Sequence, residues 1–148
     1  MDFAIRRAGA ADLALAREVL VEIDGRTVSG DTPMLELLSD PLWYLLLAEA
    51  DGHAVGGLWG CALRRAHRPE PEFMLYEMAV REAYWNQGIG RGLVKAFMAE
   101  ARKAGAHEVW VLTNQSNARA MAMYARAGMT RPNPDDVMLS VEIDATAS

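Results

Sequence analysis

Apolar and polar residues follow strand or helix periods along most of the chain, and glycine or proline separates the segments. Residues 3–7 alternate apolar and charged side chains, which predicts a short strand. From Asp12 to Gly25 the apolar residues recur at helical spacing, with a capping residue at the start and glycine at the end. A second, shorter helix is expected from Thr32 to the residues before Pro41, with proline in its first turn.

The middle of the chain has the pattern of a hairpin followed by a further strand. Residues 42–50 and 54–65 are predicted strands, and the Asp-Gly dipeptide at 51–52 is a strong two-residue turn signal between them. After a loop that contains two prolines, residues 72–80 are expected to form the next strand.

Helix and strand patterns alternate in the last third. Residues 88–103 have helical apolar spacing with a charged opposite face, and residues 117–127 form a further expected helix. Between them, residues 107–112 are nearly all apolar, which is typical of a strand buried on both faces. Residues 137–143 are expected to be the last strand. The predicted class is therefore α/β, as one domain over residues 1–148 with a loose tail at 145–148.

Composition excludes several classes of protein. The 148 residues carry 15 Lys and Arg against 20 Asp and Glu, a net charge of −5. This balance disfavours nucleic acid as a ligand and favours a cationic substrate. No apolar run approaches the roughly 20 residues of a spanning helix. No signal peptide is visible, and a single Cys excludes an internal disulfide, so we expect a cytoplasmic protein.

The most informative segment is residues 85–93, with the sequence Trp-Asn-Gln-Gly-Ile-Gly-Arg-Gly-Leu. It lies between a predicted strand and an amphipathic helix, so its backbone N–H groups and the helix N-terminus would form a phosphate cradle. A tight turn that needs positive φ is the alternative. The chain lacks the Gly-Lys-Ser/Thr of a Walker loop, and no acidic residue follows the strand at 107–112 as in dinucleotide-binding folds.

Three segments resemble the GNAT superfamily of N-acetyltransferases: residues 76–80, residues 86–93, and residues 117–129 with their Tyr-x-x-x-Gly-hydrophobic ending. The resemblance implies a GNAT fold, with a mixed, mostly antiparallel sheet, a splayed parallel strand pair at the cofactor site, and helices on both faces. One departure is Trp85, where the family usually has Arg or Gln. Within the superfamily the chain is most similar to type I aminoglycoside 3-N-acetyltransferases, although residues 115–118 are less acidic than in that group.

The resemblance implies acetyl-CoA as the cosubstrate and assigns residues to it. The pyrophosphate would rest on the loop, and the pantetheine arm would pair with the strand like an added strand. Asn117, at the start of a helix, would contact the pantetheine or act only as an N-cap. The residues implied for the loop and the strand are Gln87, Gly88, Ile89, Gly90, Arg91, Met78, Ala79 and Val80.

Three residues are candidates for catalysis. The resemblance makes Tyr124 the acid that protonates the leaving thiolate and a second contact to the cofactor, whereas a packed helix residue is the alternative. The resemblance to the type I enzymes places Glu77 beside the acceptor amine and makes it the preferred base. Glu72 would accept a proton through water or bind substrate charge, or it is a solvated strand end. Their separation of five positions predicts that Glu72 and Glu77 point to opposite faces.

The expected function is transfer of an acetyl group from acetyl-CoA to a primary amine of a cationic small molecule, by direct attack. The resemblance points to the 3-amino group of an aminoglycoside antibiotic. The alternatives are another amine, such as a polyamine, an amino acid or a peptide N-terminus, and a non-catalytic acyl-CoA sensor. No metal site is expected, because the three His and the single Cys lack ligand spacing. A homodimer formed through residues 137–143 is a further expectation.

Overall fold

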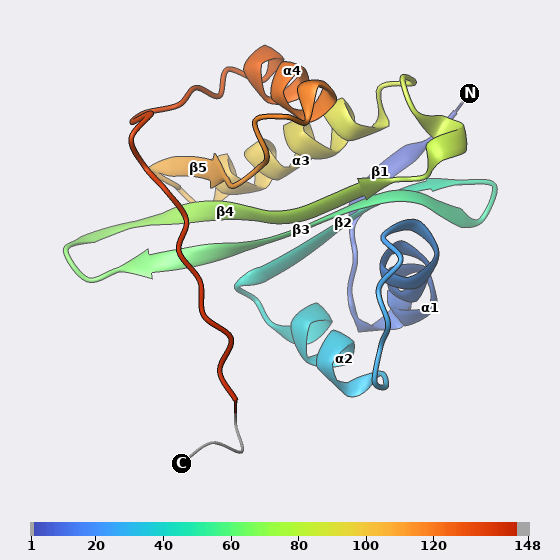
Figure 1. Cartoon of the computed structure of the whole chain (residues 1–148). Helices are drawn as coiled ribbons and strands as arrows, with labels where there is room; N and C mark the ends of the chain where they lie inside the picture. The colour runs from blue at the N-terminus through green and yellow to red at the C-terminus, as the bar shows by residue number, and fades with distance from the viewer. Residues whose placement is uncertain (1, 145–148) are drawn as a thin grey trace.

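A five-stranded sheet in the order β1-β2-β3-β4-β5 organises the chain in the computed structural model, which describes residues 2–144 (Figure 1). Its strands are β1 (Ala4–Arg7), β2 (Trp43–Ala50), β3 (His53–Arg65), β4 (Arg68–Val80) and β5 (Glu108–Val111). The first four strands pair antiparallel, and β4 pairs with β5 in parallel. The expected mixed, mostly antiparallel sheet is therefore confirmed.

Helices cover both faces of the sheet (Figure 1). One face carries the 3-10 turn η1 (Ala10–Asp12), α1 (Leu13–Arg17), the π-helix η2 (Glu18–Ile23) and α2 (Thr32–Ser39). The other carries α3 (Ile89–Lys103), preceded by the 3-10 turn η3 (Glu82–Tyr84), and α4 (Ala118–Arg126). Across residues 2–144, no helix combines the length and apolar character needed to cross a membrane.

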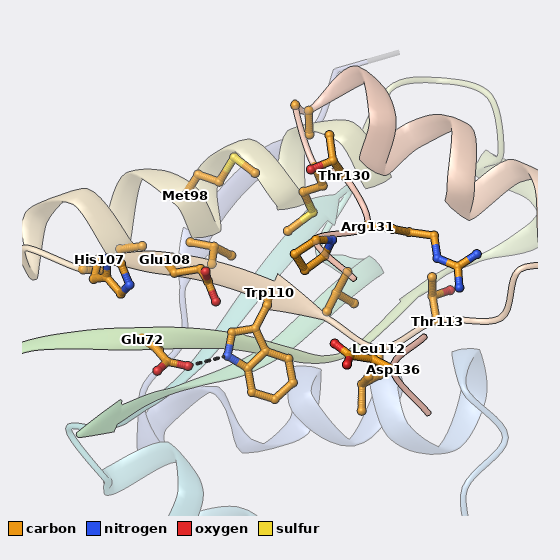
Figure 2. A pocket seen from close by; sticks show the side chains of 18 of the residues that line it. Glu72, Met98, His107, Glu108, Trp110, Leu112, Thr113, Thr130, Arg131 and Asp136 are labelled. Atoms are coloured by element: carbon orange, nitrogen blue, oxygen red, sulfur yellow. Dashed lines mark hydrogen bonds between the residues drawn. The ribbon is translucent and has the colours of Figure 1, made fainter. Parts of the chain in front are cut away.

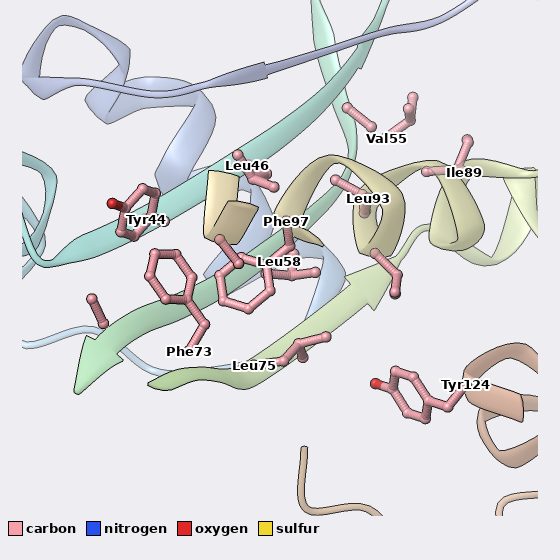
Figure 3. Close-up of a cluster of buried hydrophobic side chains, with 14 of the residues drawn as sticks. Tyr44, Leu46, Val55, Leu58, Phe73, Leu75, Ile89, Leu93, Phe97 and Tyr124 are labelled. Atoms are coloured by element: carbon pink, nitrogen blue, oxygen red, sulfur yellow. The ribbon is translucent and has the colours of Figure 1, made fainter. Parts of the chain in front are cut away.

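Each face has its own hydrophobic core. Leu58 and Phe73 of the sheet pack with Phe97 of α3, while Trp59, the next residue along β3, packs on the side of α1 and α2. Figure 3 shows the first of these clusters. Helix α3 approaches very closely, because a Cβ added at Gly60 would lie 2.4 Å from two ring atoms of Phe97. Burial on both faces makes β2 and β3 the interior of the sheet.

The first helical segment differs from the single helix predicted over residues 12–25. It is one turn of α-helix followed by a π-helix, in which the Asp24 N–H donates to the Val19 carbonyl at 2.9 Å. Apolar spacing cannot distinguish the two forms, because a π-turn changes the period by less than one residue over one turn.

Strand β4 begins at Arg68, so the predicted loop before residue 72 is wrong. The chain turns at residues 66–67, and both prolines lie inside the strand. Here β4 extends beyond β5 and its pairing with β3 is irregular, so the missing proline N–H groups break no ladder. Strand β5 is also less buried than predicted, because it is the edge of the sheet.

The strand predicted at residues 137–143 is absent. The segment is extended and crosses in front of the sheet in Figure 1, and its apolar side chains are exposed: Val137, Met138, Leu139, Val141 and Ile143. Alternating apolar residues favour a strand only where an edge is available to pair with. Among residues 2–144, no strand pairs with this segment.

Candidate functional site

A bulge in β4 creates the main feature of the site. Trp59 of β3 lies opposite Glu77, but Gly60 lies opposite Leu75, so Tyr76 is an extra residue in β4. Pairing of β4 with β5 also ends at Leu75, which faces Val111. From residue 76 to residue 80, no strand of the described chain lies on this side of β4. The backbone edge is open to another extended chain.

The bulge also changes which way the carboxylates of β4 face. Phe73 before the bulge and Met78 after it both pack in the α3 core, although five positions separate them. Their neighbours Glu72 and Glu77 therefore share the opposite face. The predicted opposite orientation of the two carboxylates is wrong, because it counted a regular strand without the extra residue Tyr76.

Glu77 lies at the edge of a pocket of about 270 Å³ between β2–β4 and the segment that joins η2 to α2. Its carboxylate Oε1 accepts a hydrogen bond from Arg26 Nη2 at 2.7 Å, and Arg26 Nε also bonds Asp24 at 2.9 Å. The rest of the wall is mostly aromatic and aliphatic, with Leu20, Val28, Met34, Leu37, Trp43, Trp59 and Tyr76, and it also includes the hydroxyl groups of Thr27 and Ser29. Glu77 is thus a carboxylate beside an apolar cavity.

The glycine loop ends in a helix N-terminus with unpaired donors. Gly88 has a φ of 84°, in the left-handed region that glycine adopts without strain, so the loop contains a tight turn with positive φ at this residue. The first α3 bond runs from Gly92 N–H to Gly88 O, at 2.9 Å. The N–H groups of residues 89–91 therefore have no acceptor in the preceding turn and can bind an anion.

Helix α4 lies beside this loop; it carries Tyr124, and Asn117 is its N-cap residue. A Cβ at Gly90 would lie 3.0 Å from the sulfur of Met123, so the absent side chain lets α4 approach. The ring of Tyr124 projects from α4 toward β4 (Figure 3) and is 8% exposed. Burial raises the pKa of Tyr124. The phenol is therefore protonated at neutral pH and makes no hydrogen bond in the part of the chain that the structure describes.

The family of the chain follows from its sequence as well as this geometry. The family model of the acetyltransferase (GNAT) family matches residues 16–129. The chain belongs to the GNAT family. A matching structure, an aminoglycoside acetyltransferase from an uncultured soil metagenomic sample in complex with sisomicin, has a TM-score of 0.81 and 24% identity. It covers 96% of this chain and 97% of that one.

Two curated relatives match shorter parts of this GNAT chain. An uncharacterized N-acetyltransferase from Mycobacterium tuberculosis is 32% identical over 93 residues, which are 63% of this chain and 56% of that protein. The ribosomal protein bS18 alanine N-acetyltransferase of Escherichia coli is 37% identical over 57 residues, 38% of each chain. The match spans less than two thirds of the length of either relative.

Trp85, at the start of the glycine loop of this GNAT chain, makes two contacts that the sequence did not indicate. Its indole Nε1 donates to the Val80 carbonyl at 2.8 Å, at the end of β4. The guanidinium of Arg119, in the first turn of α4, stacks on the ring at 3.9 Å from its centroid. Arg119 is thus a cation held beside the glycine loop, and only its place in the segment of residues 117–129 could have suggested it.

Glu72 has a different environment from Glu77. Its Oε1 accepts a hydrogen bond from Trp110 Nε1 at 3.1 Å (Figure 2), and its Oε2 forms an ion pair with Arg65 Nη1 at 2.9 Å. It lies at a larger groove of about 860 Å³ along β5 and the segment after α4. These contacts link β3, β4 and β5 through the Glu72 carboxylate. They give Glu72 a structural role in which it stays charged.

Asn117 is the N-cap of α4, because its Oδ1 accepts a hydrogen bond from the Ala120 N–H at 3.1 Å.

Cys61 is buried, and burial raises the pKa of its thiol, which disfavours the nucleophilic thiolate. Within residues 2–144, no three His, Cys, Asp or Glu side chains form a group that could hold a metal ion.

Proposed function

We propose that this chain is an acetyl-CoA-dependent N-acetyltransferase that acts on a primary amine of a cationic small molecule. The observation that carries the proposal is the open edge of β4 at residues 76–80. It has the carboxylate of Glu77 on one face of the sheet and leads directly into the glycine loop. An extended thioester bound along this edge would have an anion site at one end and a base at the other.

The cofactor would be held mainly by backbone groups. The pyrophosphate binds the N–H groups of Gln87, Gly88, Ile89, Gly90 and Arg91, where the positive end of the α3 dipole stabilises it. The pantetheine arm pairs with the main chain near Met78 and Val80 as an added strand. The carbonyl of Val80 already accepts from Trp85, so its N–H is the group left for pairing at that residue. Asn117 and Arg119 add side-chain contacts from α4.

The reaction would be a direct transfer. The amine nitrogen attacks the thioester carbonyl carbon, the new bond is C–N, and the bond that breaks is C–S. Glu77 takes the proton that the ammonium must lose before attack, directly or through water. Tyr124 donates its proton to the departing sulfur, so CoA leaves as the thiol. The second proton that the nitrogen loses as the C–S bond breaks restores the Tyr124 phenol. Glu72 is the second candidate for the base, but it would first have to release Arg65 or Trp110.

We propose an aminoglycoside as the acceptor, acetylated at its 3-amino group. The likeness of residues 73–80 to the type I aminoglycoside enzymes and the net charge of −5 support this choice. A second candidate is the N-terminal amine of a peptide, which is favoured by the matching segment of the ribosomal protein alanine acetyltransferase.

The test is release of CoA thiol from acetyl-CoA with a panel of amines: a gentamicin-type aminoglycoside, its analogue without the 3-amino group, spermidine, and a peptide that begins with alanine. Release with the first alone supports 3-N specificity. Glu77→Gln should lower the rate by about 10²-fold or more, Glu72→Gln less, and Glu70→Gln, at an exposed residue of the same strand, not at all. Calorimetric binding of acetyl-CoA without turnover of any amine would instead indicate the non-catalytic sensor.

A further inference from the structure

The pocket beside Glu77 has a cover. Residues 24–31 have no helix or strand structure except for isolated bends, and residues 27–30 line the pocket. The segment bends at Gly25 and Gly30, with φ values of 71° and 142°. Arg17 pairs with Asp31 at its far end. Arg26 reaches β4, 51 positions away, and bonds Glu77 at 2.7 Å. One ion pair therefore ties this cover to the candidate base.

The pocket itself is selective in its chemistry. Among the described residues that line the pocket, Glu77 and the phenol of Tyr76 are the only ionisable groups. The rest of the wall is mostly aromatic or aliphatic. One donor is unused: Trp59 is 4% exposed, and its indole N–H has no hydrogen-bond partner within the described residues. Buried donors normally have an acceptor, so this N–H marks a place where a bound oxygen atom would be stabilised.

The Arg26–Glu77 pair is built to open. The side chain of Arg26 is 59% exposed, and exposed ion pairs are weak because water competes with them. Arg26 also bonds the Asp24 carboxylate through Nε, at 2.9 Å. If its Nη2 leaves Glu77, the guanidinium still keeps a carboxylate partner. Glu77 would lose its cationic partner in this step, which is unfavourable for a carboxylate beside an apolar cavity. A second cation that binds Glu77 would restore the ion pair.

We propose that Arg26 occupies the position of the acceptor's ammonium group, and that acceptor binding replaces the guanidinium on Glu77 and opens the cover formed by residues 24–31. This assignment rests on the proposed function of Glu77. The acceptor class is an ammonium joined to a ring that carries an oxygen. The ammonium lies on Glu77, the ring lies against Trp43 and Tyr76, and the oxygen accepts from Trp59. A volume of about 270 Å³ equals that of about nine water molecules, which suits a single ring.

The test measures binding without turnover, so it does not depend on finding the physiological acceptor. The probes are 2-phenylethylammonium and the neutral 2-phenylethanol, titrated by NMR in the absence of acetyl-CoA. Wild type should prefer the ammonium. Arg26→Ala should bind the ammonium about 1.4- to 5-fold more tightly, the factor that corresponds to one exposed ion pair, with no gain for the alcohol. Arg26→Lys keeps the competing cation and should resemble wild type.

Arg68→Ala is the matched control. It removes the same charge and breaks an exposed ion pair with Glu70, at 3.3 Å, at the start of β4. Equal binding of the two probes to wild type, or an Arg26→Ala effect no larger than that of Arg68→Ala, would overturn the proposal. If the probes behave as expected but no amine is acetylated, the enzymatic function fails and the cation site stands. If amines are acetylated and Arg26→Ala has no effect on probe binding, the enzymatic function stands and the proposed role of Arg26 fails.

Discussion

Tyr124→Phe should separate catalysis from stability in this chain. The phenol makes no hydrogen bond within the described residues, so removing its oxygen breaks no interaction and leaves the buried ring in place. The free energy of unfolding should therefore change by less than about 0.5 kcal/mol, as at positions without a broken contact. Loss of a positioned acid should lower turnover by about 10²- to 10⁴-fold. Such a large effect on rate without an effect on stability would identify a group that acts only on the reacting atoms.

The assay is the initial rate of CoA release with the best amine of the panel, together with urea unfolding and calorimetry of acetyl-CoA binding. Tyr84→Phe is the control, because Tyr84 is a partly buried phenol that packs against the same core as the buried Tyr124. The pH profile adds an independent readout. Burial raises the pKa of Tyr124 above its ordinary value of about 10, so the protonated form is lost only as pH rises beyond that value.

Turnover of wild type should therefore show no decline from this group up to about pH 9.5. Turnover of Tyr124→Phe within twofold of wild type would refute the acid role. A rate loss accompanied by an equal loss of acetyl-CoA affinity would refute it too, and would show that the hydroxyl binds the cofactor.

Three further changes test the fold, the cofactor site and the assembly. Gly60→Ala should lower the free energy of unfolding by about 1–3 kcal/mol in urea, because the new Cβ would meet Phe97 at 2.4 Å, whereas Gly9→Ala has open space and should cost less. Arg119→Ala should raise KM for acetyl-CoA at unchanged kcat, and a KM that is equal at low and high salt would argue against a phosphate contact. Truncation after Asn133 should convert a dimer to a monomer in sedimentation; a monomeric full chain contradicts the expected homodimer.

The parts of the fold that sequence could predict are those set by short-range patterns. Helix α3 and its loop follow from apolar spacing and from glycines at 88 and 90, and the structure begins the helix within one residue of the prediction. The orientation of Glu72 and Glu77 could not be predicted, because a bulge depends on how β3 pairs with β4 and leaves no period in β4 itself. Strand periodicity predicted the strand correctly but assigned the side chains after residue 76 to the wrong faces of the sheet.

The contacts of the candidate site were beyond prediction for a similar reason. Arg26 and Glu77 are 51 positions apart, and nothing near either residue signals the other. Trp59 is buried, as its place in an apolar strand predicts, but burial alone does not show that its N–H lacks an acceptor or that a cavity lies beside it. Residues 137–143 have the composition of a strand, yet a strand also needs a neighbouring edge.

The extra residue at position 76 determines which face of the sheet each later side chain of β4 points to. A substitution at Tyr76 changes one side chain, but deletion of the residue would exchange the two faces for everything that follows in the strand. Glu77 would turn into the α3 core, and Met78 would turn toward the pocket. Variation in length should therefore be far less tolerated here than variation in residue type. A homologue one residue shorter at this point would have to place its carboxylate at a different position to keep the same chemistry.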